Sequence, residues 1–302
     1  RRTAKKRVSD RLFAPLTLDG EVGLRGAPRL GFVRSLYGDL LGAGEPFALA
    51  SGALMGLANA WNYFQSGVRF PFLGTPAVPE PVRPFYGVYA TPRPVAHFEL
   101  LLEWLQDRRE QGWRPRAALD LGTGCGVVSL LLHAHGGASL REIVACDLNP
   151  NAVEGARAEF ARQGLAGRVG VVQSDLLDGL RGRTFDLVVF NPPWLPLPEA
   201  ELPGEPPRTL LDLGNFYPPG LFDRLFAQLP GVLRPGGAAV ILFSNHAVSR
   251  GYVSEHPLAA ALARTAAGPG DPLELSQVAR RDFRPEGRRR RTGRGAAEEA
   301  DE

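Results

Sequence analysis

The sequence predicts an α/β protein in which a doubly wound, mostly parallel sheet follows an N-terminal helical region. Three observations lead to this prediction. Short apolar runs alternate with amphipathic stretches after residue 94, a glycine-rich turn joins the first of these runs to a helix, and prolines crowd residues 71–94. Alternating strands and helices are typical of parallel sheets that helices cover on both faces.

Composition favours a folded protein without disulfides. The 302 residues are 44% hydrophobic, which is enough to fill a core. Two cysteines, Cys125 and Cys146, give no disulfide framework and favour a reducing compartment, so we expect a cytoplasmic protein. The longest apolar stretch, residues 47–61, is shorter than the roughly 20 residues that cross a bilayer, so no membrane segment is expected.

The elements are expected in a regular order along the chain. Apolar residues recur at helical spacing over 28–70, and the prolines of 71–94 restrict the backbone to an extended connector. Beyond the connector the pattern predicts helices at 95–107, 127–133, 149–163 and 221–229, and strands at 117–121, 142–147, 169–173, 185–190 and 238–243. Two weaker strand candidates follow at 273–283 and 288–292. We therefore divide the chain into a helical region with its connector (1–84), an α/β domain (85–283) and a charged, disordered tail (284–302).

A glycine-rich loop follows the first strand of the α/β domain. The run Asp120, Leu121, Gly122, Thr123, Gly124, Cys125, Gly126 opens a helix, and glycine lets such a backbone approach a ligand closely. The next strand ends at Asp147, whose carboxylate can accept hydrogen bonds from ribose hydroxyls. The third glycine stands one position too early for a dinucleotide fingerprint, which disfavours NAD.

A third acidic residue, Asp175, ends the next strand and is followed by the apolar Leu176. A carboxylate beside an apolar residue can hold an adenine amino group. Because parallel strands end at one edge of a sheet, the loop, Asp147 and Asp175 are expected to meet at one crevice. This crevice suits a nucleoside-like ligand.

The most specific signal follows the strand 185–190, where the chain reads Asn191, Pro192, Pro193, Trp194. An amide or base amine is a poor nucleophile because its lone pair is delocalised. The Asn191 side chain and the Pro192 carbonyl can accept both N–H bonds and turn that lone pair toward a methyl donor, and Trp194 can stack on the planar group. These three residues are the predicted catalytic residues.

The motifs DLGTGCG, ACDLNP, SDLL and NPPW resemble those of the class I S-adenosylmethionine-dependent methyltransferases. The segment Tyr86 to Pro94 resembles the one that precedes the first motif in the release-factor-type glutamine methyltransferases, although residues 95–97 lack the acidic residue usual there. The resemblance implies a seven-stranded, Rossmann-like sheet and S-adenosylmethionine as cofactor. It implies cofactor contacts from Asp120, Gly122, Thr123, Gly124, Gly126, Asp147, Leu148, Asp175, Leu176 and Asn191.

The resemblance favours a glutamine side-chain amide in a translation factor or ribosomal protein as the acceptor. An exocyclic amine of ribosomal RNA or DNA is the first alternative, since the arginine run 288–291 could contact phosphates. A catalytically silent S-adenosylmethionine-binding partner protein is the second. No metal is expected, because His133 and His135 lack further ligands at zinc spacing.

Overall fold

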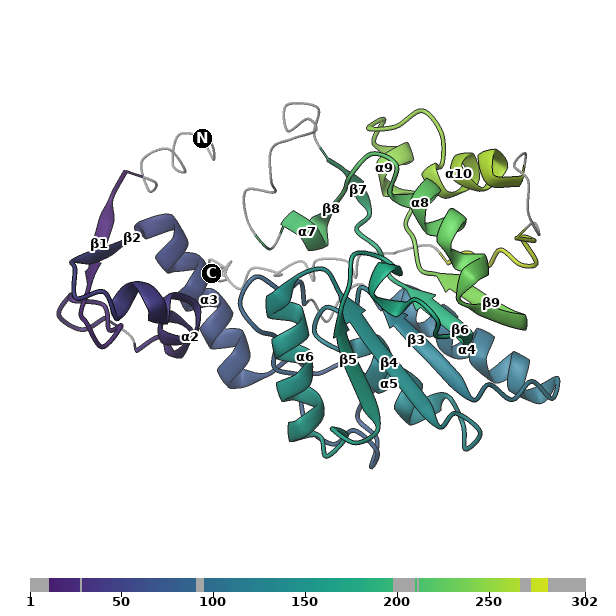
Figure 1. Ribbon diagram of the computed structural model, residues 1–302, viewed down its shortest axis with the longest axis horizontal. Coiled ribbons are helices and arrows are strands. Elements are labelled where there is room, and N and C mark those ends of the chain that lie inside the picture. The colour runs from purple at the N-terminus through teal and green to yellow at the C-terminus, as the bar shows by residue number, and fades with distance from the viewer. Residues whose placement is uncertain are drawn as a thin grey trace, which may run out of the picture.

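The computed structural model describes residues 11–27, 29–90, 95–197, 210, 212–266 and 273–281. An N-terminal module at the left of Figure 1 leads through residues 67–90 into a larger α/β domain. This connector is not extended as the prolines predicted: Val68 and Val82 form an antiparallel bridge, and Phe70, Leu73 and Val78 between them pack into the core of the α/β domain. Within the described residues, no helix combines the length and apolar character that crossing a membrane requires. The expected tail, 284–302, and the second weak strand candidate, 288–292, lie outside the described residues.

The N-terminal module combines two helices with a strand pair. Helices α2 (Gly31–Leu41) and α3 (Ser51–Ser66) agree with the predicted helical region, whereas β1 (Phe13–Leu16) and β2 (Phe47–Ala50) form an antiparallel pair that the sequence did not predict. These strands have only four residues each, too few to show a clear alternation. The buried ring of Phe32 lies at the centre of the module, with its centroid 4.9 Å from that of Trp61.

Five parallel strands form the central sheet of the α/β domain. They are β3 (Ala117–Leu121), β4 (Glu142–Asp147), β5 (Val169–Gln173), β6 (Phe185–Phe190) and β9 (Leu233–Ile241). Their order is β5-β4-β3-β6-β9, so the winding reverses between β4 and β6 at β3. The predicted doubly wound sheet is confirmed. Strand β9 begins at Leu233, five residues before the predicted start at 238. It therefore includes residues 235–237, where a turn was expected, and its register with β6 is irregular there.

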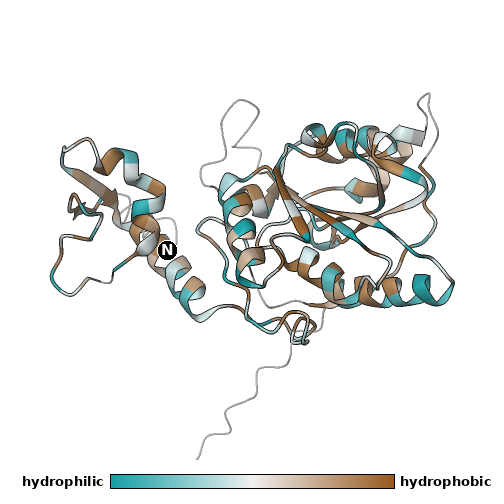
Figure 2. Cartoon of the chain, turned by 60° about the horizontal axis from the view of Figure 1, so that its bottom comes forward, coloured by the Kyte–Doolittle hydropathy of each residue, from teal (hydrophilic) through white to brown (hydrophobic). Residues whose placement is uncertain are grey.

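Helices cover both faces of this sheet. One core cluster joins the sheet to α4 (Ala96–Glu110), α5 (Val127–His135) and α6 (Pro150–Arg162). A second cluster joins the opposite face to α8 (Leu221–Gln228) and α10 (Pro257–Ala266). Figure 2 shows the hydrophobic residues gathered along the strands and the inner sides of these helices. Shorter elements complete the domain: η1 (Asp178–Leu180), β7 (Leu195–Pro196), α7 (Asp212–Asn215), β8 (Phe216–Tyr217), η3 (Leu229–Gly231) and α9 (His246–Ser249).

The first weak strand candidate, 273–283, is wrong for the residues that can be compared. Residues 273–281 form no strand and do not extend the sheet beyond β9. Arg281 instead pairs with Glu99 at 2.7 Å, and with Glu103, both on α4. The sheet of the described residues therefore has five strands, where the resemblance implied seven.

The connector between the two parts lies against α6. The buried carboxylate of Glu159 accepts a hydrogen bond from the Arg83 amide at 3.0 Å, and the Gln163 side chain donates to the Glu80 carbonyl at 3.1 Å. Gly155 lets Phe85 approach, since a Cβ there would lie 2.7 Å from the Phe85 Cβ. These contacts hold residues 80–85 along α6.

Candidate active site

The glycine loop follows β3 at the point where the winding of the sheet reverses. Gly122 and Gly126 have φ angles of +66° and +84°, which disfavour residues with a Cβ. Neighbouring rings also exclude one, since a Cβ would lie 2.9 Å from the Phe190 ring at Gly122 and 2.8 Å from the Phe160 ring at Gly126. Both glycines are therefore required for the loop to pass this close to β6 and α6.

Asp120 and Thr123, both predicted to contact the cofactor, bond to the loop itself. Asp120 is 1% exposed, and its Oδ2 accepts from the Thr123 hydroxyl at 2.6 Å and from the Ser129 amide and hydroxyl at 2.8 and 2.7 Å. These bonds tie the loop to the start of α5. Sequence reasoning missed Ser129, although it is the one polar residue in the apolar run Val127 to Leu132.

Burial raises the pKa of Asp120 to about 6, although its three hydrogen bonds oppose the shift. Because the folded pKa is raised, the folded chain binds this proton more tightly, and stability is lost as pH rises from about 4 through 6. Asp120→Asn should keep the three acceptor contacts through its amide oxygen. We expect its free energy of unfolding in urea to fall less between pH 4 and 7 than that of the unaltered chain, by up to about 3 kcal/mol. Equal pH dependence in the two proteins would contradict this assignment.

Asp147 lies at the end of β4 beside the loop. Its Oδ2 accepts from the Gly124 amide at 2.8 Å and its Oδ1 accepts from the Asn149 amide at 2.8 Å. Burial raises its pKa. Each oxygen keeps a further lone pair, so the carboxylate can accept from two neighbouring hydroxyls. The adjacent Leu148 is 47% exposed and offers an apolar surface for a planar ring.

The segment before α4 lies over the glycine loop. Asn149 and Asn151 donate from their side chains to the carbonyls of Gly87 and Tyr86, at 2.9 and 3.0 Å. A Cβ at Gly124 would lie 3.8 Å from the Tyr89 carbonyl oxygen, which places this segment in contact distance of the loop. The two asparagines were not predicted as site residues, because their partners lie more than 60 residues away in the sequence.

Asp175 follows β5 and forms an ion pair with a residue of α8. Its Oδ2 accepts from Arg224 of α8 at 2.9 Å, and the side chain is 45% exposed. The neighbouring Leu176 is buried, has a φ of +47°, and its carbonyl accepts from the Ser174 hydroxyl at 2.8 Å. One carboxylate oxygen remains for a ligand, and the adenine role of Asp175 and Leu176 stays a prediction.

The catalytic candidates lie together after β6. Asn191 Oδ1 is buried and has no hydrogen-bond partner among the described residues. The Trp194 indole donates to the Leu242 carbonyl at 3.2 Å, and the ring meets His97 of α4 edge-on, with centroids 5.0 Å apart. Burial lowers the pKa of His97 to about 4, so its imidazole is neutral near pH 7. The hydrogen bond to Leu242 and the ring contact with His97 thus fix the position of the indole. That Trp194 stacks on the acceptor amide stays a prediction.

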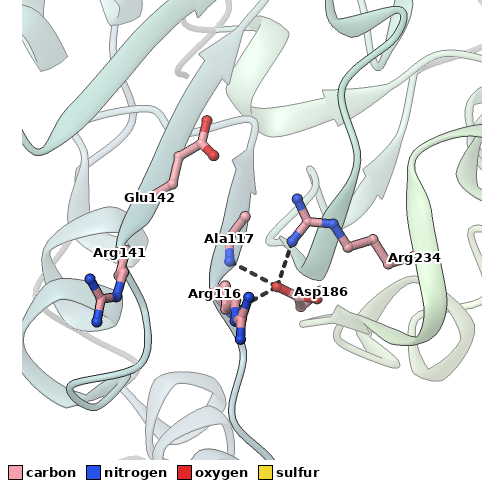
Figure 3. A pocket seen from close by; sticks show the side chains of 6 residues that line it. All are labelled: Arg116, Ala117, Arg141, Glu142, Asp186 and Arg234. Carbon is pink, nitrogen blue, oxygen red and sulfur yellow. Dashed lines mark hydrogen bonds and ion pairs between the residues drawn. The ribbon is translucent and has the colours of Figure 1, made fainter.

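A separate cavity of about 530 Å³ lies at the opposite end of the sheet, where the strands begin (Figure 3). Asp186 Oδ2 accepts there from the amides of Arg116 and Ala117 and from the Arg234 guanidinium, at 2.7 to 2.9 Å. These bonds join the starts of β3, β6 and β9. Partial burial acts to raise the pKa of Asp186, but the amide hydrogen bonds and Arg234 together lower it. Ligands of open α/β sheets bind at the carboxyl ends of the strands, so we assign this cavity no catalytic role.

Comparison with known proteins identifies relatives of the segment that contains the glycine loop and Asn191. Residues 82–197 match the family described as the methyltransferase small domain. A release factor glutamine methyltransferase from Moorella thermoacetica is 41% identical over 126 residues, which cover 39% of this chain and 42% of the relative. A putative protein N5-glutamine methyltransferase from Methanocaldococcus jannaschii is 32% identical over 127 residues, or 42% of this chain and 61% of the relative. The chain thus spans about half the length of these curated relatives.

Among solved structures, this chain is similar to the ribosomal protein L11 methylase from Lactobacillus delbrueckii subsp. bulgaricus. The two share 17% sequence identity with a TM-score of 0.41, over 63% of this chain and 77% of the methylase.

Proposed function

We propose, from the premise that residues 82–197 are a class I methyltransferase domain, that this chain is an S-adenosylmethionine-dependent N-methyltransferase. Its acceptor is the side-chain amide of a glutamine in a release factor or a related protein of translation. One observation carries the proposal: at the carboxyl end of β6, next to the glycine loop, Asn191 has a buried oxygen without a hydrogen-bond partner among the described residues. The relatives, named for glutamine methylation, favour the amide over a base amine.

The residues of the crevice suit the donor. Asp147 would bind the ribose hydroxyls, Leu148 the adenine ring, and the loop at Gly122 and Gly124 the amino-acid part. When bound, S-adenosylmethionine supplies an electrophilic methyl on a positively charged sulfonium. A neutral His97 beside Trp194 puts no like charge near that sulfonium, which favours binding of the donor.

The acceptor amide is activated by alignment. Asn191 Oδ1 and the Pro192 carbonyl would each accept one N–H, which turns the nitrogen lone pair toward the methyl group. Two consecutive prolines restrict the backbone after Asn191, so little freedom is lost when the acceptor binds. As the nitrogen gains the methyl group, one of its protons leaves to solvent, and the donor departs as a neutral thioether.

Transfer of a labelled methyl group tests the proposal. The purified chain is incubated with methyl-labelled donor and a cell lysate, and the products are then treated separately with protease and with nuclease. We expect the label in material that protease degrades and nuclease leaves intact. Label that survives protease and is lost to nuclease would instead identify a nucleic-acid amine as the acceptor, and binding of the donor without any transfer would identify a silent partner protein.

A further inference from the structure

Tyr217 carries a second buried polar atom without a partner. Its side chain is 7% exposed, and its hydroxyl, like Asn191 Oδ1, is shielded from water and has no hydrogen bond to any described residue. Buried hydroxyls nearly always find a partner, because losing water without a replacement is unfavourable. An unsatisfied hydroxyl of this kind indicates a partner that arrives with a ligand.

Tyr217 is connected to Trp194 through strand pairing and ring contacts. Strand β8 pairs with β7, which begins at the residue after Trp194, and this pairing sets Tyr217 opposite Pro196. The Tyr217 ring centroid lies 6.1 Å from that of Phe243. The residue before Phe243, Leu242, provides the carbonyl that accepts the Trp194 indole N–H. Tyr217 is therefore connected to the predicted catalytic motif in two ways, through the pairing of β8 with β7 and through Phe243 and Leu242.

The surroundings of Tyr217 make its hydroxyl a hydrogen-bond donor. Its ring also packs against Phe222 of α8, with centroids 5.1 Å apart. Burial raises the pKa of Tyr217, so the hydroxyl stays protonated near neutral pH. By contrast, Asn191 Oδ1 and the Pro192 carbonyl are acceptors only. A polypeptide acceptor brings carbonyl oxygens as well as N–H groups, and these carbonyls need a donor.

We propose, resting on the proposed function above, that the Tyr217 hydroxyl donates a hydrogen bond to a carbonyl oxygen of the acceptor polypeptide. Tyr217 is then an acceptor-binding residue that favours a peptide over adenine, which has no carbonyl oxygen. It makes no contact with the donor, which the glycine loop and Asp147 hold.

Tyr217→Phe removes the hydroxyl and keeps the ring. With a release factor as acceptor, we expect KM to rise about three- to tenfold, the effect of one hydrogen bond, while kcat changes less than about twofold. The Kd of the donor, measured by calorimetry, should not change. The variant should be as stable as the unaltered chain or more stable, because an unsatisfied buried group has been removed. Tyr252→Phe is the matched control, since Tyr252 is 62% exposed, and it should alter none of these values.

The outcomes separate this inference from the proposed function. An unchanged KM in Tyr217→Phe would overturn the inference, and an unchanged KM with lowered stability would show that the hydroxyl serves the fold. A rise in KM that Tyr252→Phe matches would also overturn it. If the unaltered chain transfers no methyl group to a polypeptide, the proposed function fails, and this inference fails with it.

Discussion

Asn191→Ala lowers kcat for methyl transfer by at least about a hundredfold and leaves the Kd of S-adenosylmethionine within about twofold of its original value. The asparagine is proposed to align the acceptor nitrogen, and its buried oxygen has no partner in the described part of the chain. Removing that oxygen therefore breaks no hydrogen bond to a described residue, and we expect the free energy of unfolding to change little. Steady-state kinetics, calorimetry and urea unfolding of the same preparation measure the three quantities.

Asn59→Ala serves as the control for this variant, because Asn59 is exposed on α3 in the N-terminal module. It should leave kcat and Kd unchanged. Turnover by Asn191→Ala at the rate of the control would show that Asn191 does not align the acceptor. Loss of donor binding in Asn191→Ala would assign the residue to the cofactor instead.

Asp147→Asn is expected to raise the Kd of the donor about tenfold to a hundredfold. Both carboxylate oxygens accept backbone amides, from Gly124 and Asn149. An asparagine offers an N–H to one of these amide donors, so one contact becomes repulsive and the loop shifts. The variant also loses the charge that strengthens hydrogen bonds from ribose hydroxyls. Calorimetry with S-adenosylmethionine and with its demethylated product measures the change.

Asp223→Asn is the matched control, because Asp223 of α8 forms a partly exposed ion pair with Arg264 of α10. Exposed pairs of this kind contribute little to stability, so this variant should bind the donor normally. Equal donor affinity in Asp147→Asn and Asp223→Asn would remove Asp147 from the cofactor site.

The sequence predicts well the elements whose residues are local and periodic. Strands β3, β4, β5 and β6 occupy the predicted ranges, because their apolar runs are bounded by glycine, proline and charged residues. The carboxyl ends of these strands then bring the glycine loop, Asp147 and Asn191 to one edge of the sheet. The two strands of the N-terminal module are too short for their sequence to show a period. Residues 273–281 form no strand, and Arg281 pairs there with Glu99 of α4, a contact that the sequence did not predict.

The sequence did not predict contacts that depend on distant residues. Asp120 is predicted to contact the cofactor, and in the fold its Oδ2 also accepts from Thr123 and Ser129, which the sequence did not predict. Its contact with the cofactor stays a prediction. Asn149 and Asn151 hold the segment over the loop, and nothing near them in the sequence identifies their partners. The unsatisfied hydroxyl of Tyr217 likewise becomes visible only when β8 pairs with β7. Such roles follow from tertiary packing, which sequence spacing does not encode.

The position of the transferred methyl group tests the central proposal most directly. A purified release factor is incubated with the unaltered chain and S-adenosylmethionine, digested, and analysed by tandem mass spectrometry. We predict one added methyl group on the side-chain nitrogen of a glutamine, and none when Asn191→Ala replaces the unaltered chain. A methyl group on any other atom of the release factor, or transfer to RNA in its place, would contradict the assignment of the acceptor to an amide held by Asn191 and Pro192.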